Sequence, residues 1–251
     1  MLKTPTIEKL EHLKFSGMLH AWQQQEDMPE LQKLDFDERF GLLVDAEFLE
    51  RENIRLSKRL QSAKLRQQAC LEDISFKHAR GLDRSLIAQL ANCSWIKQGF
   101  SLLITGPTGV GKSYITCALA NKACREGFTV SYQRAPRFFQ DLTFARLNGS
   151  YNRLLAKFAK ISLLILDDFA LTPIADEQCR DLLEVVDDRC NRVSTIFSSQ
   201  LPLDSWHKTM ENPTIADAIL DRVVHSSYKI SLTGASLRKK SKGDNNKEFD
   251  E

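Results

Sequence analysis

The residues with the clearest chemical meaning form a glycine-rich loop that is followed at once by a lysine and a serine. Gly106, Gly111, Lys112 and Ser113 match the pattern GxxxxGK[ST]. Glycines let backbone N–H groups converge on phosphate oxygens, and Lys112 is expected to neutralise the β and γ phosphates. Ser113 is expected to hold Mg²⁺ through its hydroxyl. The sequence predicts an ATP site whose contacting residues are Gly106, Pro107, Thr108, Gly109, Val110, Gly111, Lys112, Ser113 and Tyr114.

The context of this loop agrees with its motif. The apolar run Leu102-Leu103-Ile104 precedes it, and a helical pattern from Ser113 to Arg125 follows it. A glycine turn that merely joins a strand to a helix would not need Gly-Lys-Ser at the start of the helix. We therefore interpret the segment as a phosphate-binding loop (P-loop).

Two acids follow a second apolar run. The sequence Leu163-Leu164-Ile165-Leu166 reads as a buried strand, and Asp167 and Asp168 end it. Ligands of open parallel sheets collect at the carboxyl ends of strands, so Asp167 is expected to bind Mg²⁺, directly or through water. Asp168 becomes the candidate base that orients the attacking water. The alternative is a strand end that carries two solvated acids.

The pattern beyond residue 99 describes the elements that must position these groups. Short apolar or β-branched runs alternate there with helical patterns, which predicts a parallel α/β sheet with helical crossovers. The expected strands are Ser101–Thr105, Thr129–Arg134, Ser162–Asp167, Ser194–Ser198 and Ser227–Leu232.

The first part of the chain has a different character. Residues 5–70 lack strand-like runs, and their apolar positions recur at helical spacing, so we expect a small all-α domain. Acids crowd its middle, whereas the helix from Arg51 to Arg66 is basic. A linker and a helix from Asp83 to Ile96 follow. The predicted domains are 1–70 (helical), 71–234 (ATPase) and 235–251 (a basic, disordered tail).

Composition gives broad limits. The chain has 251 residues with 42% hydrophobic and 27% charged side chains, which is usual for a soluble globular protein. Its six cysteines form no CxxC pair and have no nearby histidine cluster, so buried free thiols are expected. No signal-like segment and no stretch of 18 apolar residues is found, so a cytoplasmic protein without a membrane partner is predicted.

With these residues in view, the chain from about Cys70 to Lys240 resembles the IstB-like transposition helper ATPases. These are relatives of the DnaC-like helicase loaders within the AAA+ class, and the helical region around Asp45–Phe48 looks similar too. Besides the two nucleotide motifs, the resemblance rests on Arg80–Arg84, Trp95-Ile96, Asp187-Asp188-Arg189, Ser194–Pro202 and Ile219–Arg222.

The resemblance implies an AAA+ P-loop fold and an ATPase that assembles on double-stranded DNA as a ring or helical filament beside an IstA-like transposase. It also implies a γ-phosphate sensor at Gln200 and an arginine finger at Arg222, which would enter the active site of a neighbouring subunit. A structural polar residue at 200 and a solvated Asp221–Arg222 pair are the alternatives. Arg238 resembles part of the C-terminal motif of the family, but no firm role is assigned to it.

Two positions depart from the family pattern. Ala170 stands where the family commonly shows glycine, and Asp168 stands where other AAA+ ATPases carry glutamate. The shorter Asp168 side chain withdraws the carboxylate by one methylene group, so water positioning would depend on a further group. Slow hydrolysis is expected.

A basic segment is the candidate DNA contact. Its bases could track backbone phosphates without reading sequence, and interleaved aromatic residues could pack or stack. The alternative is a solvated basic helix pair with core aromatics. The helix from Arg51 to Arg66 is a second candidate, either for DNA or for an acidic partner. The predicted DNA-binding residues are Arg134, Arg137, Arg146, Arg153 and Lys157, with Lys160 beside them.

Three functions remain open at this stage. The leading one is an oligomeric ATPase that binds DNA and assists a transposase in target selection. A loader of a replicative helicase shares the same ATPase core, and preference for duplex over single-stranded DNA would separate the two. An ATP-gated DNA scaffold with marginal hydrolysis is the third, and Asp168 keeps it open.

Overall fold

The computed structural model describes residues 3–76 and 80–237. Contacts divide the chain into two compact units, residues 1–58 and residues 59–251. The sequence placed the domain boundary near residue 70 instead. Residues after 58 pack within the second unit: Arg59 Nε donates a hydrogen bond of 2.9 Å to the carbonyl of Cys124, and Ala69 is buried.

The first unit consists of helices. Its elements are α1 (Lys3–His12), α2 (Ser16–Asp27), the short 3-10 helix η1 (Leu31–Lys33) and α3 (Phe36–Ala63), which continues a few residues into the second unit. Gly17 lets α2 approach α3 closely, because a Cβ there would lie 2.6 Å from the carbonyl oxygen of Ala46. The buried carboxylate of Glu47 accepts from Met18 N at 3.1 Å and from Arg51 Nε at 2.6 Å, which ties the same two helices together.

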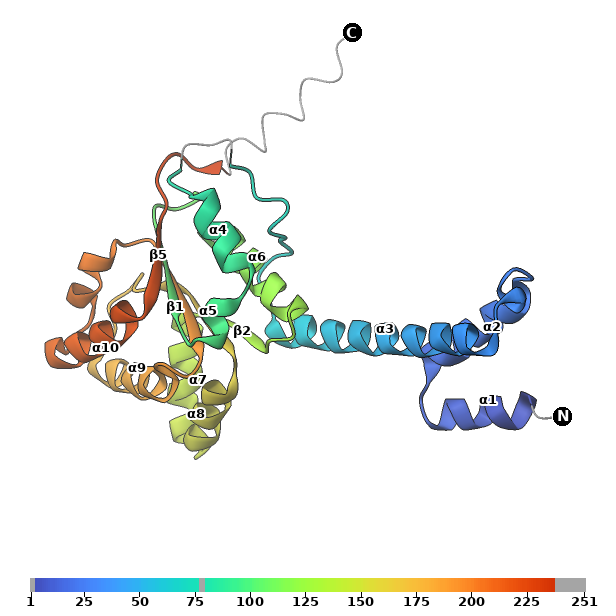
Figure 1. The fold of residues 1–251 in the computed structure, drawn as a ribbon. Helices are drawn as coiled ribbons and strands as arrows, with labels where there is room; N and C mark the ends of the chain where they lie inside the picture. The colour runs from blue at the N-terminus through green and yellow to red at the C-terminus, as the bar shows by residue number, and fades with distance from the viewer. Residues whose placement is uncertain (1–2, 77–79, 238–251) are drawn as a thin grey trace, which may run out of the picture. The chain divides into compact units, whose positions relative to one another are not determined.

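The second unit is built on a five-stranded parallel sheet, as the sequence predicted (Figure 1). Its strands are β1 (Ser101–Thr105), β2 (Val130–Arg134), β3 (Leu163–Phe169), β4 (Ser194–Ser199) and β5 (Ser227–Ser231). They lie in the order β2-β3-β4-β1-β5, so β4 separates the P-loop strand β1 from the acidic strand β3. Near-continuous burial of β1, β3 and β4 explains why these strands read as unbroken apolar runs.

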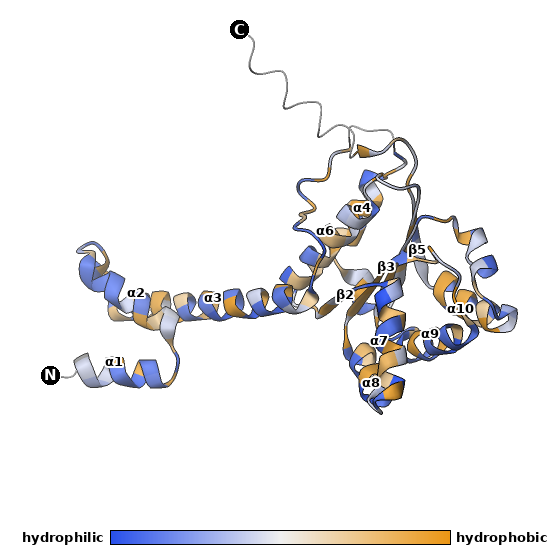
Figure 2. Ribbon diagram, turned by 180° about the vertical axis from the view of Figure 1, so that it is seen from behind, coloured by the Kyte–Doolittle hydropathy of each residue, from blue (hydrophilic) through white to orange (hydrophobic). Residues whose placement is uncertain are grey.

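Helices flank this sheet, and several show hydrophobic and hydrophilic bands in Figure 2. The core includes Phe138, Phe158, Phe169, Phe197 and Trp206, and the Phe169 ring centroid lies 4.8 Å from that of Trp206. The helices of this unit are α4 (Arg84–Ala91), α5 (Ser94–Lys97), α6 (Lys112–Arg125), α7 (Ala135–Leu147), α8 (Tyr151–Lys160), α9 (Asp176–Arg189) and α10 (Pro213–His225), with 3-10 turns η2 (Leu203–Ser205) and η3 (His207–Thr209).

The expected helix from Asp83 to Ile96 was wrong in its continuity. The chain forms α4 and α5 instead, and Cys93 between them has a left-handed backbone with φ +57°. That conformation cannot continue a right-handed helix. The indole N–H of Trp95 donates to the carbonyl of Leu90 at 3.0 Å, so the break is stabilised by a buried side chain.

The expectation of free thiols holds for all six cysteines, of which Cys93, Cys117, Cys124 and Cys179 are buried. A search for membrane spans among the described residues finds no helix that is both long enough and apolar enough to cross a bilayer. The expected basic tail, 235–251, is described only to Leu237; Arg238 and the rest lie outside the described residues.

Candidate active site

The P-loop connects β1 to α6 and needs its glycines for two separate reasons. Gly106, Gly109 and Gly111 have φ values of +144°, +86° and +101°, a region that residues with a Cβ rarely adopt. Other segments also approach the loop closely: a Cβ on Gly106 would lie 2.2 Å from Leu232 O, and one on Gly109 would lie 2.1 Å from Ser236 Oγ. The loop therefore turns its backbone in a way that only glycine permits.

The Lys112 ammonium group lies over this loop. It donates to the carbonyl oxygens of Gly106 at 2.6 Å and Pro107 at 2.9 Å, although the residue begins α6 and is buried. The N-terminus of α6 begins at the same residue, so its backbone N–H groups and its positive dipole end lie beside the ammonium group. Positive charge and N–H donors thus face one point, which is the arrangement that a phosphate group requires.

Arg80 supports the loop, a role that the sequence did not predict. The buried guanidinium donates to the carbonyls of Ser75 at 2.6 Å and Val110 at 3.4 Å, and its burial lowers the pKa of Arg80. The segment after β5 packs there as well, since Leu237 N donates to Gly109 O at 3.0 Å. Residues from both ends of the second unit therefore hold the P-loop in place.

A β-bulge aims the two acids of β3. Between Leu166 and Phe169 the strand advances three residues while β4 advances two, from Phe197 to Ser199, so one residue of β3 is extra. The bulge includes Asp168, whose φ is +56°. Without it, strand alternation would direct the side chains of Asp167 and Asp168 to opposite faces of the sheet.

Asp167 is almost fully buried and faces the P-loop. Its Oδ2 accepts a hydrogen bond from Ser113 Oγ at 2.9 Å and another from the hydroxyl of Tyr132. Burial acts to raise the pKa of Asp167, but hydrogen bonds such as those from Tyr132 and Ser113 outweigh it, so this pKa lies below its ordinary value. Asp167 is therefore ionised beside the serine that would bind Mg²⁺.

Asp168 contacts two arginines. Arg134 Nε donates to its Oδ2 at 3.1 Å, and Arg66 NH1 lies 3.7 Å from the same oxygen. Arg66 NH1 also lies 3.5 Å from Asp167 Oδ2. The sequence placed Arg66 at the end of a basic helix, but α3 ends at Ala63 and Lys64 turns the chain with φ +53°. A functional placement for Arg66 was therefore missed, and no local signal in the sequence indicates it.

Gln200 follows β4 and reaches the P-loop, because Thr108 Oγ1 donates to its Oε1 at 2.6 Å. The P-loop, Gln200 and Asp168 line one cavity of about 550 Å³. The other lining residues are Arg66, Gln67, Asp73, Ser75, Arg80, Tyr114, Arg134, Leu171 and Leu237. Four of the five predicted catalytic residues, Lys112, Asp167, Asp168 and Gln200, are thus brought together within the second unit.

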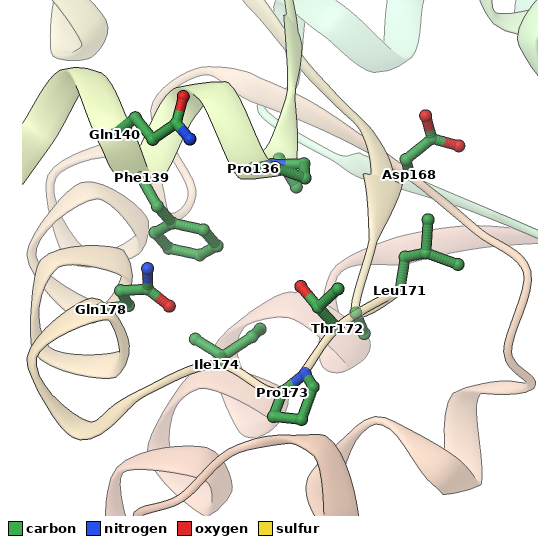
Figure 3. A pocket seen from close by; sticks show the side chains of 11 residues that line it. Pro136, Phe139, Gln140, Asp168, Leu171, Thr172, Pro173, Ile174 and Gln178 are labelled. Atoms are coloured by element: carbon green, nitrogen blue, oxygen red, sulfur yellow. The ribbon is translucent and has the colours of Figure 1, made fainter.

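A smaller cavity of about 170 Å³ lies on the other side of Asp168, between α7 and the loop after β3 (Figure 3). Phe139 and Ile174 point into it, whereas the Asp168 carboxylate points away from them. The carboxylate therefore belongs to the larger cavity.

Arg222 does not line the larger cavity. Its guanidinium pairs with Asp187 of α9 and donates to the carbonyl of Ala218 at 2.8 Å. Asp221 pairs instead with His225 at 3.2 Å, so the expected alternative of an Asp221–Arg222 pair does not form.

The predicted DNA contacts fall into two groups. Arg146 on α7 is engaged by the buried carboxylate of Asp181, and Arg134 donates to Asp168. Arg137, Arg153 and Lys157 are exposed, and within the described part of the chain no hydrogen bond or ion pair engages them. The interleaved aromatics Phe138, Phe139 and Phe158 are buried, so they pack in the core rather than stack on bases.

No group of three or more His, Cys, Asp and Glu residues that could hold a metal occurs among residues 3–76 and 80–237. A Mg²⁺ ion at this site would therefore depend on Ser113, Asp167 and the phosphates of a nucleotide, a set that suits a cation which keeps most of its waters.

A parallel sheet in the order described, with a P-loop after β1 and two acids near the carboxyl end of β3, defines an AAA+ P-loop nucleotide-binding protein. The chain belongs to the family of IstB-like ATP binding proteins, whose model matches residues 8–245. These are the ATP-binding proteins of IS21-type insertion sequences.

Relatives agree with this family assignment, and solved structures show a similar fold. An insertion sequence ATP-binding protein of Sinorhizobium fredii, y4pL, is 46% identical over 239 residues, which is 95% of this chain and 98% of the relative. The fold is similar to that of DnaI (TM-score 0.57, 22% identity, 67% of this chain and 90% of that one). It is also similar to the DnaC helicase loader (TM-score 0.54, 18% identity, 65% and 96%).

Proposed function

We propose that this protein hydrolyses ATP in a Mg²⁺-dependent reaction and uses the cycle to assist a transposase on DNA. The observation that supports the ATPase most directly is the hydrogen bond between Ser113 and Asp167, made beside Lys112. In P-loop enzymes this serine and this acid hold Mg²⁺ against the β and γ phosphates. Mg²⁺ bound there would neutralise charge on the transferring phosphoryl group.

The remaining residues have roles that follow from their positions. Lys112 binds the β and γ phosphates, Asp168 orients the attacking water as the base, and Gln200 contacts the γ-phosphate from the end of β4. We assign Arg222 to the active site of a neighbouring copy, because it does not line the cavity of its own chain. Hydrolysis would then require a homo-oligomer, either a ring or a helical filament.

Double-stranded DNA is the proposed platform for this assembly. Arg153 and Lys157 line a groove of about 420 Å³ together with Phe144, and Phe144 is exposed. Exposed cations that no described residue engages, at an open groove, suit backbone phosphates, which give affinity without sequence readout. The transposase partner is inferred from the name of the relatives, which are insertion sequence ATP-binding proteins.

Phosphate release from ATP tests the enzymatic part. We expect slow turnover with Mg²⁺ that rises with duplex DNA, and loss of turnover in Lys112→Ala and Asp168→Asn. Asp168→Asn should still bind nucleotide, because the P-loop is intact. If phosphate release is undetectable while ATP still drives assembly on DNA, the protein is an ATP-gated scaffold and the hydrolysis proposal fails.

Salt-dependent DNA binding tests the platform. Replacing Arg153 and Lys157 by Gln should weaken duplex binding and reduce the slope of log affinity against log salt by about two, one for each lost phosphate contact. Arg180→Gln is the matched control, because Arg180 is exposed but pairs with Asp176 at 2.7 Å. Equal affinity of the double variant and the control would rule out this surface. Electron microscopy with ATP and duplex DNA would show whether Arg222 enters a neighbouring site.

A further inference from the structure

Arg66 is held beside the active site by the chain that follows α3. Backbone N–H groups of Gln67 and Arg66 point at the buried Cys117 thiol on α6, and Ala69 is buried nearby in sequence. This segment lies entirely within the second unit, 59–251. The helix α6 follows the P-loop directly and begins at Lys112. Arg66 is thus positioned by the same helix that positions Lys112.

The guanidinium of Arg66 lies at the end of the cavity where the γ-phosphate belongs. Its NH1 is 3.5 Å from Asp167 Oδ2 and 3.7 Å from Asp168 Oδ2, the two acids assigned to Mg²⁺ and to water. A cation so close to both acids lies near the terminal phosphate of a bound nucleotide rather than near its adenine ring. The Arg66 side chain also lines the cavity, with 43% of its surface exposed.

The contacts of Arg66 leave donors for an anion. Its side chain is hydrogen-bonded to Tyr132, and this contact raises the pKa of Arg66, whereas its approaches to Asp167 and Asp168 are ion pairs at longer range. Arg134 differs from Arg66, because its Nε already donates a 3.1 Å hydrogen bond to Asp168. A guanidinium has five N–H donors in a planar fork that matches phosphate oxygens.

We propose that Arg66 is a γ-phosphate contact supplied by the same chain, so that this residue distinguishes ATP from ADP. The proposal rests on the ATP site described above and adds a residue to it. Arginine supplied in the same chain can stabilise the phosphoryl group as an arginine finger does. Arg66 would thereby act on the nucleotide independently of any neighbouring subunit.

Equilibrium binding of ADP and of a non-hydrolysable ATP analogue, each with Mg²⁺, tests this. Arg66→Gln should weaken binding of the ATP analogue about tenfold, the size of one hydrogen bond to a charged group, and leave ADP within about twofold. Arg66→Lys should recover part of the loss, because it keeps the charge but not the fork. Arg125→Gln is the control, since Arg125 pairs with Glu72 at 2.9 Å outside the cavity.

The outcomes separate this inference from the proposed hydrolysis. Equal affinity of the wild type for both nucleotides, equal weakening of both by Arg66→Gln, or no effect on either would overturn the assignment. Retained ADP binding shows that Arg66→Gln is folded. If Arg66→Gln does not fold, the ratio of ATP-analogue affinity to ADP affinity in Arg66→Lys decides the question. Absence of phosphate release in the wild type would refute hydrolysis, but the ratio of ATP-analogue affinity to ADP affinity would still test the role of Arg66.

Discussion

The Thr108 hydroxyl donates a hydrogen bond of 2.6 Å to Gln200 Oε1 and so joins the P-loop to the end of β4. The two residues are far apart in the sequence, and the order of strands brings them together because β4 lies beside β1. The protein itself therefore holds the amide of Gln200 at the mouth of the phosphate site, without help from a bound nucleotide.

Replacing Gln200 by Ala should lower the rate of ATP hydrolysis by about tenfold or more while ATP binding changes little, because a γ-phosphate contact acts mainly in the transition state. Thr108→Val is the matched control: it removes the hydrogen bond but keeps the Gln200 amide. Steady-state phosphate release and nucleotide binding measure the two effects. Weakened binding with an unchanged maximal rate would show that Gln200 serves the P-loop only.

Arg146 is expected to act on stability rather than on DNA. Its guanidinium donates to Asp181 Oδ1, which is buried, and the Tyr151 hydroxyl donates to the same oxygen at 2.7 Å. Arg146→Ala should lower the free energy of unfolding by about 2 kcal/mol, less than for a fully buried pair because Arg146 is partly exposed. Urea unfolding measures the change. Arg153→Ala, on the same helix pair, should leave stability unchanged; equal losses would contradict this account.

Replacing Ala170 by glycine should stabilise the protein. The Ala170 φ of +55° is unfavourable for a residue with a Cβ by about 1–2 kcal/mol, partly offset by the greater chain entropy that glycine loses on folding. Ala170→Gly is expected to raise the free energy of unfolding by up to about 1 kcal/mol. Ala156→Gly is the control, because Ala156 is exposed in the interior of the right-handed helix α8, where glycine should destabilise by about 1 kcal/mol.

Arg189 should be among the most costly residues to replace in the second unit. The buried guanidinium donates to Thr195 Oγ1 at 3.0 Å, to Ile161 O at 2.9 Å, and to the carbonyls of Phe158 and Ser194. Arg189→Met leaves these carbonyls unsatisfied, so we expect a loss of about 3 kcal/mol in thermal or urea unfolding. Arg192→Met, at an exposed position nearby, should change little. A small loss for Arg189 would mean that water replaces its hydrogen bonds.

The sequence predicted the sheet and the P-loop well because both depend on local patterns. The strand bounds agree within two residues, since buried parallel strands such as β3 are unbroken apolar runs. The helix break at Cys93 could not be predicted, because a left-handed residue that is not glycine carries no signal and depends on the packing of Trp95.

The candidate site was predictable only where a motif encodes it. Lys112, Ser113 and Asp167 follow from motif and strand order, and Gln200 from the family resemblance. Arg66 and Tyr132 did not follow from either, because their approach to Asp167 depends on how distant segments pack. For the same reason the sequence could not predict the pairing of Arg146 with the buried Asp181, and Arg146 was interpreted as a DNA contact.

The buried Cys117 thiol can serve as a probe of local opening beside the nucleotide cavity. Burial raises the pKa of this thiol, and the backbone of Arg66 and Gln67 covers it. An alkylating reagent reacts with an accessible thiolate, so it can modify the buried Cys117 only when the second unit opens locally around α6. The labelling rate at Cys117 therefore reports local opening beside the nucleotide cavity. A nucleotide that engages Arg66 should hold the adjoining backbone against α6 and slow labelling.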